Sequence, residues 1–270
     1  MSEMDNPRQN QLLAMLPAPN YAYVSSLLER VEMCCGDVLG EADEALPYVY
    51  FPVTGVIAKL YYTENGTSSE LALIGNEGML GISLFMGGES MPHQALVVMP
   101  GYAYRLRRSL FEKEIERIGG QRSGALHGML LRYTQALITH LTQIAACNRH
   151  HSIEQQFSRW LLMILDRQSG SEIAITQQSI ASLLGVRREG ITEAAGKLQQ
   201  AGVIRYYRGH ISVLERAGLE AQSCECYQVI KNEFARLRAI NANPSPLSRP
   251  LTAIKTYGRA KDLRRRYAFG

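Results

Sequence analysis

Arg188 and Glu189 are adjacent charged residues at the start of an amphipathic segment in the last third of the chain. The planar guanidinium group of an arginine can bond O6 and N7 of one guanine, and a carboxylate can accept a hydrogen bond from the amino group of cytosine. Thr192 and Glu193 lie one helical turn further along the same polar face. These four residues are candidates for reading base edges in DNA, although on their own they could equally be a solvated helix surface.

The residues around this segment predict how it is presented. Thr176 can cap a first helix whose apolar residues fall at i, i+3 and i+4 on one face, namely Ile180, Leu183 and Leu184. Gly185 can take the left-handed conformation that ends a helix, so a short turn leads into a second helix opening at Arg187. That helix would pack on the first through Ile191, Ala194, Ala195 and Leu198. The pattern is a helix-turn-helix, whose second helix reaches base edges with its first residues.

Two short strand-like runs follow directly, at Val203–Tyr207 and Ile211–Leu214, joined through Arg208-Gly209-His210. A hairpin placed directly after a helix-turn-helix is a wing. Arg205 and Arg208 would then lie along the phosphate backbone, which makes them candidates for phosphate contacts.

The stretch from about Cys147 to Tyr227 resembles the C-terminal DNA-binding domain of the bacterial Crp/Fnr transcription regulators. Arg188, Glu189 and Glu193 align with the family's R-E-x-x-x-R recognition helix, so a carboxylate stands where an arginine is usual. Glu193 would repel phosphate and prefer a cytosine or adenine amino group, so the family's usual half-site is not expected. The resemblance also implies phosphate contacts for Thr176 and Gln178, and Arg187 is a further candidate for contacting the backbone.

Composition favours an ordered, DNA-binding protein. The 270 residues suffice for two domains with cores, and an apolar fraction of 46% argues against disorder. The N-terminal 150 residues hold 11 Lys and Arg against 15 Asp and Glu, whereas the remaining 120 hold 18 against 10. Basic charge is thus concentrated beside the helix-turn-helix. No apolar run approaches the roughly 18 residues that cross a bilayer, and no signal-peptide pattern opens the chain, so we expect a cytoplasmic protein without membrane contact.

Short strand-like runs between turn residues characterise the N-terminal part and predict an antiparallel jelly roll, or β-roll. They lie at Val31–Cys35, Tyr48–Phe51, Val56–Tyr62, Ser69–Ile74, Ala95–Met99 and Tyr102–Leu106. Helices are expected before the roll at Pro7–Leu16 and Asn20–Arg30, and after it at Ser109–Gly119, with Ser109 as its cap. The spacing resembles the β-roll of Crp/Fnr proteins, and the fold class we expect is α+β.

Family members that bind cyclic AMP carry a G-E-L-G loop, whose carboxylate contacts the ribose, and a later R-S, whose arginine contacts the phosphate. The corresponding loop here reads Gly78-Met79-Leu80-Gly81, and the arginine region reads Met91-Pro92-His93-Gln94-Ala95. Both charged groups are absent, so we expect no cyclic AMP binding of the usual kind. Gly78, Gly81, His93 and Gln94 are the candidate ligand-loop residues. A cupin-like metalloenzyme would need further His ligands beside His93, so no enzymatic activity is expected.

A long helix is expected from about Ser123 to Asn148. Its apolar positions, spaced by four and three, resemble a coiled-coil seam at Leu126, Leu130, Tyr133, Leu137, Leu141 and Ile144. Because Met129, Leu131, Ile138 and Ala145 are also apolar, the helix is expected to lie on its own β-roll as well. In the Crp/Fnr family it is the dimer interface, and two recognition helices one DNA turn apart require a dimer. We therefore expect a two-fold homodimer through this helix and a hinge at Cys147–Ser152.

Five cysteines occur, at positions 34, 35, 147, 224 and 226. An odd number without an export signal indicates reduced thiols. Cys147 with His150 and His151, or Cys224-x-Cys226, are possible metal ligands, but neither group has zinc-finger spacing. On the sequence alone we assign no metal and no cofactor.

The predicted domains are a sensor roll at 1–122, a dimerisation helix and hinge at 123–150, a winged helix-turn-helix at 151–238 and a basic, disordered tail at 239–270. Within the third, Ile153–Arg167 is expected to be a packing helix with Trp160 in its core, Glu172–Ile175 a short strand, and Leu219–Arg238 the last helix. The function these features predict is a homodimeric transcription regulator that binds double-stranded DNA, with RNA polymerase as a further partner and an unidentified effector. The alternative is a small-molecule sensor whose winged domain contacts proteins, and the steep salt dependence of DNA binding would separate the two.

Overall fold

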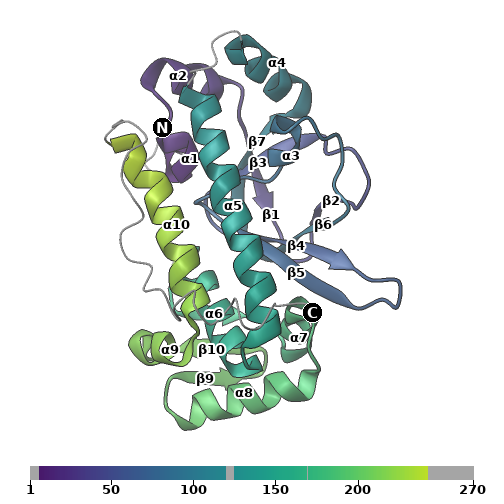
Figure 1. The fold of residues 1–270 in the computed structure, drawn as a ribbon, viewed down its shortest axis with the longest axis vertical. Helices are drawn as coiled ribbons and strands as arrows, with labels where there is room; N and C mark the ends of the chain where they lie inside the picture. Colours follow the sequence, from purple (N-terminus) through teal and green to yellow (C-terminus); the bar gives the residue numbers. More distant parts are fainter. Residues whose placement is uncertain (1–5, 120–124, 169, 243–270) are drawn as a thin grey trace, which may run out of the picture.

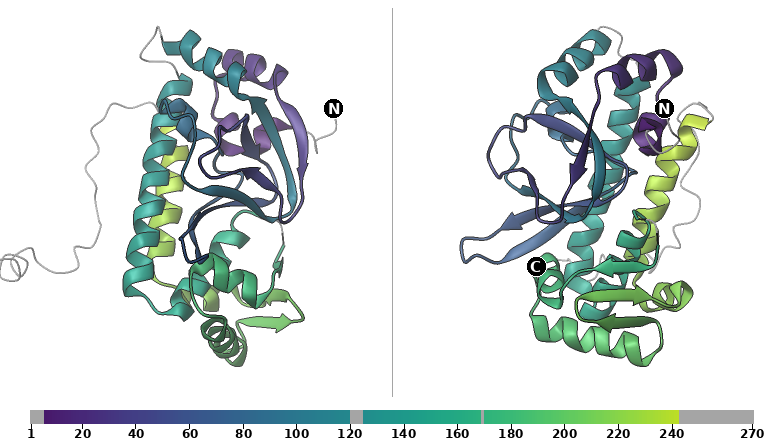
Figure 2. Two further views of the ribbon diagram at one scale, coloured as in Figure 1. Left: turned by 90° about the vertical axis from the view of Figure 1, so that its right-hand side faces the viewer. Right: turned by 180° about the vertical axis from the view of Figure 1, so that it is seen from behind.

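The computed structural model describes residues 6–119, 125–168 and 170–242 (Figure 1). An N-terminal β-roll lies above a C-terminal domain of helices and a small sheet, and two long helices, α5 and α10, run along one side of the roll (Figures 1 and 2). The fold class is α+β, as the sequence predicts.

The roll consists of two antiparallel sheets, with strand orders β1-β7-β3 and β2-β6-β4-β5. Its strands are β1 Glu29–Met33, β2 Val38–Gly40, β3 Tyr48–Pro52, β4 Val56–Tyr62, β5 Ser68–Ile74, β6 Gln94–Met99 and β7 Gly101–Arg107. The space between the sheets is filled by apolar side chains, among them Met33, Tyr50, Ile57, Leu80 and Val97. Burying both sheet faces against each other and against helices removes this apolar area from water, which stabilises the roll.

Short helices flank the roll, and two of their boundaries, together with one unpredicted strand, correct the sequence prediction. The helices are η2 Pro7–Gln9, α1 Gln11–Ala14, α2 Ala18–Ser26, α3 Ile82–Phe85 and α4 Arg108–Gly119. Helix α2 ends at Ser26 and not at Arg30, because the chain enters strand β1 at Glu29. Helix α4 begins at Arg108, so Ser109 lies inside it and is not its cap, and Glu112 pairs with Arg108 at 2.6 Å. Strand β2 was not predicted, since it has only three residues and pairs irregularly with β6.

The long helix α5 spans Ala125–His150 and packs against helix α10, Glu225–Ala242. The two lie side by side in both views of Figure 2. Phe234 of α10 contacts the ring of Tyr133 at a centroid distance of 6.5 Å and that of His140 at 6.1 Å. Helix α10 extends four residues beyond the predicted end at Arg238, and residues 243–270 of the predicted tail lie outside the described residues.

The C-terminal domain contains α6 Ile153–Leu165, α7 Gln177–Leu184, α8 Arg188–Gln200 and α9 Arg216–Gln222, with a sheet of β8 Glu172–Ala174, β9 Ile204–Tyr207 and β10 His210–Val213. Trp160, predicted to be a core residue, is fully buried. The single helix predicted over Leu219–Arg238 is in fact two, because the chain breaks at Ser223-Cys224 between α9 and α10. None of the described helices is long and apolar enough to cross a membrane.

Polar contacts, two of them buried, join the C-terminal domain to strand β5 and the loop after it. The indole Nε1 of Trp160 donates to Oε2 of Glu70 at 2.8 Å, and the Arg167 guanidinium pairs with Glu77 at 2.8 Å. The hydroxyl group of Ser68 also donates to the backbone carbonyl of Ser182 in α7 at 2.8 Å. The winged domain is therefore docked on the roll in this structure.

Candidate DNA-binding surface

Helices α7 and α8 form the predicted helix-turn-helix, and local hydrogen bonds explain its boundaries. The side chain of Thr176 accepts from the backbone N–H of Ser179 at 3.1 Å and so caps α7. Gly185 ends α7 with a φ of 65°, a left-handed conformation that costs glycine little. Ile180, Leu183, Ile191 and Leu198 are buried between the helices. The sequence prediction of the motif and of both caps is confirmed.

The polar face of α8 is open to solvent, and it carries the four residues that the sequence singled out for base contacts. Arg188, Glu189, Thr192 and Glu193 are all exposed. Thr192 donates to the side-chain oxygen of Gln177 at 2.8 Å, and Glu193 pairs with Lys197 one turn further on at 2.9 Å. Arg188 and Glu189 thus stand at the exposed start of the helix, whereas Glu193 already has a cation beside it.

The five candidate phosphate contacts, which lie at the start of α7, before α8 and on the wing, are exposed as well: Thr176, Gln178, Arg187, Arg205 and Arg208. Arg187 is the residue preceding α8, next to the free N–H groups of the first turn, where phosphate binds favourably. Tyr207 pairs with His210 across a two-residue turn in which Arg208 and Gly209 have φ values of 47° and 81°. This turn holds the Arg208 guanidinium 5.0 Å above the Tyr207 ring at the tip of the wing.

Two family models match the chain side by side. Residues 30–117 match the model of the cyclic nucleotide-binding domain, and residues 155–222 match the model of the Crp-like helix-turn-helix domain. The chain belongs to the Crp/Fnr family. Its first matched region coincides with the β-roll and α4, and its second with α6 to α9.

Solved structures share this fold. A protein described as a Crp/Fnr transcriptional regulator from Eubacterium rectale superposes with a TM-score of 0.61 at 16% identity, over 80% of this chain and 98% of that one. FixK2 from Bradyrhizobium japonicum gives 0.59 at 17% identity, over 73% and 98%. The c-di-GMP responsive regulator CLP of Xanthomonas campestris gives 0.54 at 13%, over 73% and 99%. Identities this low establish the likeness of fold alone. No curated protein sequence matches the chain significantly.

In this Crp/Fnr chain the backbone of the candidate ligand loop Gly78–Gly81 is largely occupied. The Tyr133 hydroxyl of α5 accepts from the Met79 N–H at 3.0 Å and donates to the Met79 carbonyl at 2.9 Å. The backbone N–H of Leu80 donates to the carbonyl of Tyr50 in β3 at 2.9 Å, and the Leu80 carbonyl accepts from the Tyr50 N–H at 3.0 Å. Met79 and Leu80 are fully buried. The loop therefore offers no carboxylate and few free backbone groups to a nucleotide.

His93 and Gln94, the other candidate ligand residues, differ in their surroundings. Gln94 donates to Glu41 at 2.8 Å and accepts from Tyr62 at 3.3 Å, so both ends of its amide are already bonded. His93 is partly buried, and burial together with the charge of Lys59 lowers its pKa to about 4. The imidazole is thus neutral at physiological pH.

Lys59 is a buried cation inside the roll that the sequence pattern did not single out. It lies two residues after Ile57 on β4, opposite Ala95, on the face that lines the interior, and burial lowers its pKa to about 8. A lysine in the otherwise apolar run V-I-A-K-L was the available signal. The roll therefore contains a positive charge on β4. The cyclic AMP-binding pattern of the family places its arginine elsewhere, in the region that corresponds to Met91–Ala95.

The predicted dimer seam on α5 requires correction. Leu126, Leu130, Tyr133, Leu137 and Ile144 are at most 6% exposed within the protomer, and Leu141 is half-buried. These side chains face the roll and α10, so they are core residues. The solvent-facing stripe of α5 runs instead through Leu131, Thr134, Ile138, Leu141 and Ala145, which also have the alternating spacing of three and four.

Proposed function

We propose that this protein is a homodimeric Crp/Fnr transcription regulator that binds a two-fold symmetric DNA site without using cyclic AMP as its usual effector. The observation that carries the proposal is the exposed polar face of α8, anchored by a capped α7 and bordered by the basic wing. In this proposal Arg188 and Glu189 read bases, and Thr192 and Glu193 modify which bases are preferred. The phosphates are contacted by Thr176, Gln178, Arg187, Arg205 and Arg208.

Glu193 is expected to change the half-site that the recognition helix prefers. Its carboxylate lies one turn beyond Glu189 on the same face and is held by Lys197. A carboxylate accepts from cytosine or adenine amino groups and is repelled by phosphate, whereas an arginine at this position would favour guanine. The preferred sequence is therefore proposed to differ at one base pair in each half-site from that of members with the R-E-x-x-x-R pattern.

The lack of cyclic AMP control is supported by the chemistry of the roll. A bound cyclic phosphate needs a paired cation or several donors, and the ribose hydroxyls need an acceptor. Met79 stands in the loop position of the ribose carboxylate, and its backbone groups are bonded to Tyr133. An effector of this roll would instead meet Lys59 and a neutral His93, which suits an anion of different shape.

The dimer is proposed to form through the exposed stripe of α5. Leu131 and Ile138 are 52% and 50% exposed, although both are large apolar residues one heptad apart. Pairing two such stripes buries them and places two copies of α8 on one side of the dimer. This geometry supplies the two recognition helices that a symmetric site requires.

The experiment that tests the proposal is selection of binding sites from a random DNA pool with the full-length protein, at moderate salt and without added ligand. A two-fold symmetric sequence with half-sites about one helical turn apart is the expected result. The affinity for that sequence should also fall steeply as salt rises, because phosphate neutralisation releases counterions. If the pool shows no enrichment, either with or without cell extract, the protein is not a sequence-specific DNA binder and the proposal fails.

A further inference from the structure

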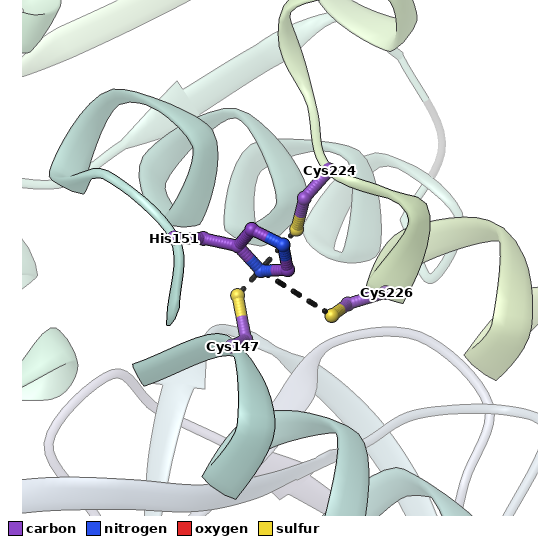
Figure 3. Close-up of side chains that lie close together, drawn as sticks. All are labelled: Cys147, His151, Cys224 and Cys226. Carbon is purple, nitrogen blue, oxygen red and sulfur yellow. Dashed lines mark hydrogen bonds between the residues drawn. The ribbon is translucent and has the colours of Figure 1, made fainter. Parts of the chain in front are cut away.

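Four metal-binding side chains converge where α5 ends and α10 begins (Figure 3). Cys147 lies in the last turn of α5, and His151 follows one turn later, directly after the helix. Cys224 lies in the short connection from α9, and Cys226 in the first turn of α10. The three sulfur atoms and the nearest imidazole nitrogen all lie within 4.8 Å of one another, although up to 79 positions separate the residues in sequence.

The separations of these atoms match the edges of a tetrahedral metal site. The sulfur atoms of Cys147 and Cys224 are 3.5 Å apart, and Nδ1 of His151 is 3.6 Å from the sulfur of Cys226. With zinc bonds of about 2.3 Å to sulfur and about 2.0 Å to nitrogen, tetrahedral edges measure roughly 3.8 Å between sulfurs and roughly 3.6 Å from sulfur to nitrogen. One ion can therefore be bound with only small side-chain shifts.

The candidate metal ligands are shielded from solvent, and neighbouring charged side chains lie beside them. Cys147, Cys224 and Cys226 are buried and form a cluster separate from the apolar cores. The other nitrogen of His151, Nε2, lies 3.3 Å from the Glu225 carboxylate, an arrangement that directs Nδ1 toward a metal. The buried guanidinium of Arg159 interacts with Cys147, so a cation is present to balance the excess negative charge of three thiolates.

We propose that Cys147, His151, Cys224 and Cys226 bind one Zn²⁺ ion that fastens the end of α5 to the start of α10. Three thiolates and an imidazole are soft to intermediate ligands that select zinc over calcium or magnesium. Four protein ligands leave no open coordination position, which is the arrangement of a structural zinc site and not of a catalytic one. Zinc binding displaces the thiol protons, which leave to solvent.

A disulfide is the competing use of these cysteines, and the geometry favours the metal. A bond between Cys147 and Cys224 would draw their sulfur atoms to about 2 Å and leave Cys226 and His151 without a role. A disulfide also requires neither an imidazole directed at the sulfurs nor a carboxylate behind that imidazole. The convergence of all four groups is explained by a tetrahedral ion.

The site has a regulatory consequence, which rests on the proposed function. Cys147 and His151 lie within the hinge at Cys147–Ser152, whereas Cys224 and Cys226 follow α9, which packs on α6 of the winged domain. Zinc would therefore hold together the two segments that attach the winged domain to α5. Removing the metal or oxidising the thiols is expected to lower the affinity for the selected DNA site by about tenfold, a typical coupling between two sites.

The test uses full-length protein treated with a chelator and reductant, then titrated with Co²⁺, which occupies zinc sites and absorbs visibly. About one Co²⁺ per chain is expected, with the charge-transfer band of thiolate ligands and the strong visible bands of tetrahedral coordination. Elemental analysis of protein expressed with zinc should give about one zinc per chain. Cys147→Ser and Cys224→Ser should each abolish the spectrum, whereas the matched double variant Cys34→Ser with Cys35→Ser, at exposed cysteines, should keep it.

The outcomes separate the metal site from the proposed function. An absent thiolate band in wild-type protein would overturn the metal site, as would a Cys147–Cys224 disulfide formed in the presence of excess zinc. These readings on the wild type hold even if a variant fails to fold. If zinc binds but the DNA selection shows no enrichment, the site remains and only the proposed function fails.

Discussion

The indole nitrogen of Trp160 donates a 2.8 Å hydrogen bond to the carboxyl group of Glu70, which connects the packing helix of the winged domain to strand β5 of the roll. Both residues are almost fully buried, and the other oxygen of Glu70 has no hydrogen-bond partner within the described residues. Burial raises the pKa of Glu70 to about 7, against the opposing effects of Arg159 and of the Trp160 hydrogen bond. This domain contact therefore depends on pH.

Glu70→Gln is expected to stabilise the protein above neutral pH. The folded-state pKa of Glu70 exceeds the ordinary value of 4.5, so its protonated form is favoured by folding. The stabilisation is fully present below about pH 4.5 and is lost as the pH rises through about 7. The amide of the substituted side chain keeps an acceptor for Trp160 but cannot ionise. The free energy of unfolding should therefore rise by about 1–3 kcal/mol near pH 8 and change little near pH 4.5.

Urea unfolding of both proteins across this pH range measures the effect. Glu77→Gln is the matched comparison, because that carboxylate pairs with Arg167 at 2.8 Å and its loss leaves a buried charge. It should destabilise by about 3 kcal/mol. If Glu70→Gln also destabilises near pH 8, the carboxylate form of Glu70 is the favoured one and the assignment is wrong.

Arg188→Ala should weaken binding to the selected DNA by about 1–3 kcal/mol and relax the preference at one base pair of each half-site. The loss follows from removing a bidentate contact to guanine. Repeating the selection with the variant measures it, and Arg107→Ala on the roll removes the same charge far from α8. A variant with an unchanged base preference would show that Arg188 does not read the sequence.

Glu193→Arg should restore the family's R-E-x-x-x-R pattern and change the preferred base at one position. The lost pair with Lys197 is largely exposed and screened by solvent, so folding should be retained. Selection with the variant identifies the changed position. Glu89→Arg provides the same charge reversal on an exposed part of the roll. If both variants gain the same affinity without a new base preference, the effect is one of net charge alone.

Ile138→Glu should convert the proposed dimer to a monomer and weaken binding to the proposed symmetric site. Two carboxylates would face each other across the proposed seam, where burying an unpaired charge is costly. Sedimentation measures the mass, and Val229→Glu, at another exposed apolar position on α10, is the control. A dimer that survives Ile138→Glu would place the interface elsewhere.

The helix-turn-helix could be predicted because its signals are local. Thr176 caps and Gly185 ends a helix through groups within a few residues, so the sequence identifies both. The α5 seam could not be assigned, because this helix has one apolar stripe against its own roll and another toward solvent. The sequence shows both periodicities without distinguishing them. Tyr133 and Leu130 were assigned to the partner, whereas Leu131 and Ile138 are the exposed residues.

The cysteine cluster was missed for a different reason. Cys147 and His151, one helical turn apart, form only half of the set, and Cys224-x-Cys226 forms the other half. Neither half has the spacing of a zinc finger by itself. The two halves are brought together by the break at Ser223-Cys224, which turns α10 back along α5. No glycine or proline marks this break in the sequence.

The break at Ser223-Cys224 also affects how the winged domain can move relative to α5. The domain is attached to α5 by two segments, the one after His150 and the one before Glu225, and the two meet within a few ångströms at the sulfur atoms of Cys147 and Cys224. Attachments this close together would act as a pivot, so rotation is the motion that we expect of this domain. The winged domain also contacts the roll through hydrogen bonds to Glu70 and Ser68. Breaking them would displace α8 through an arc while the pivot stays in place.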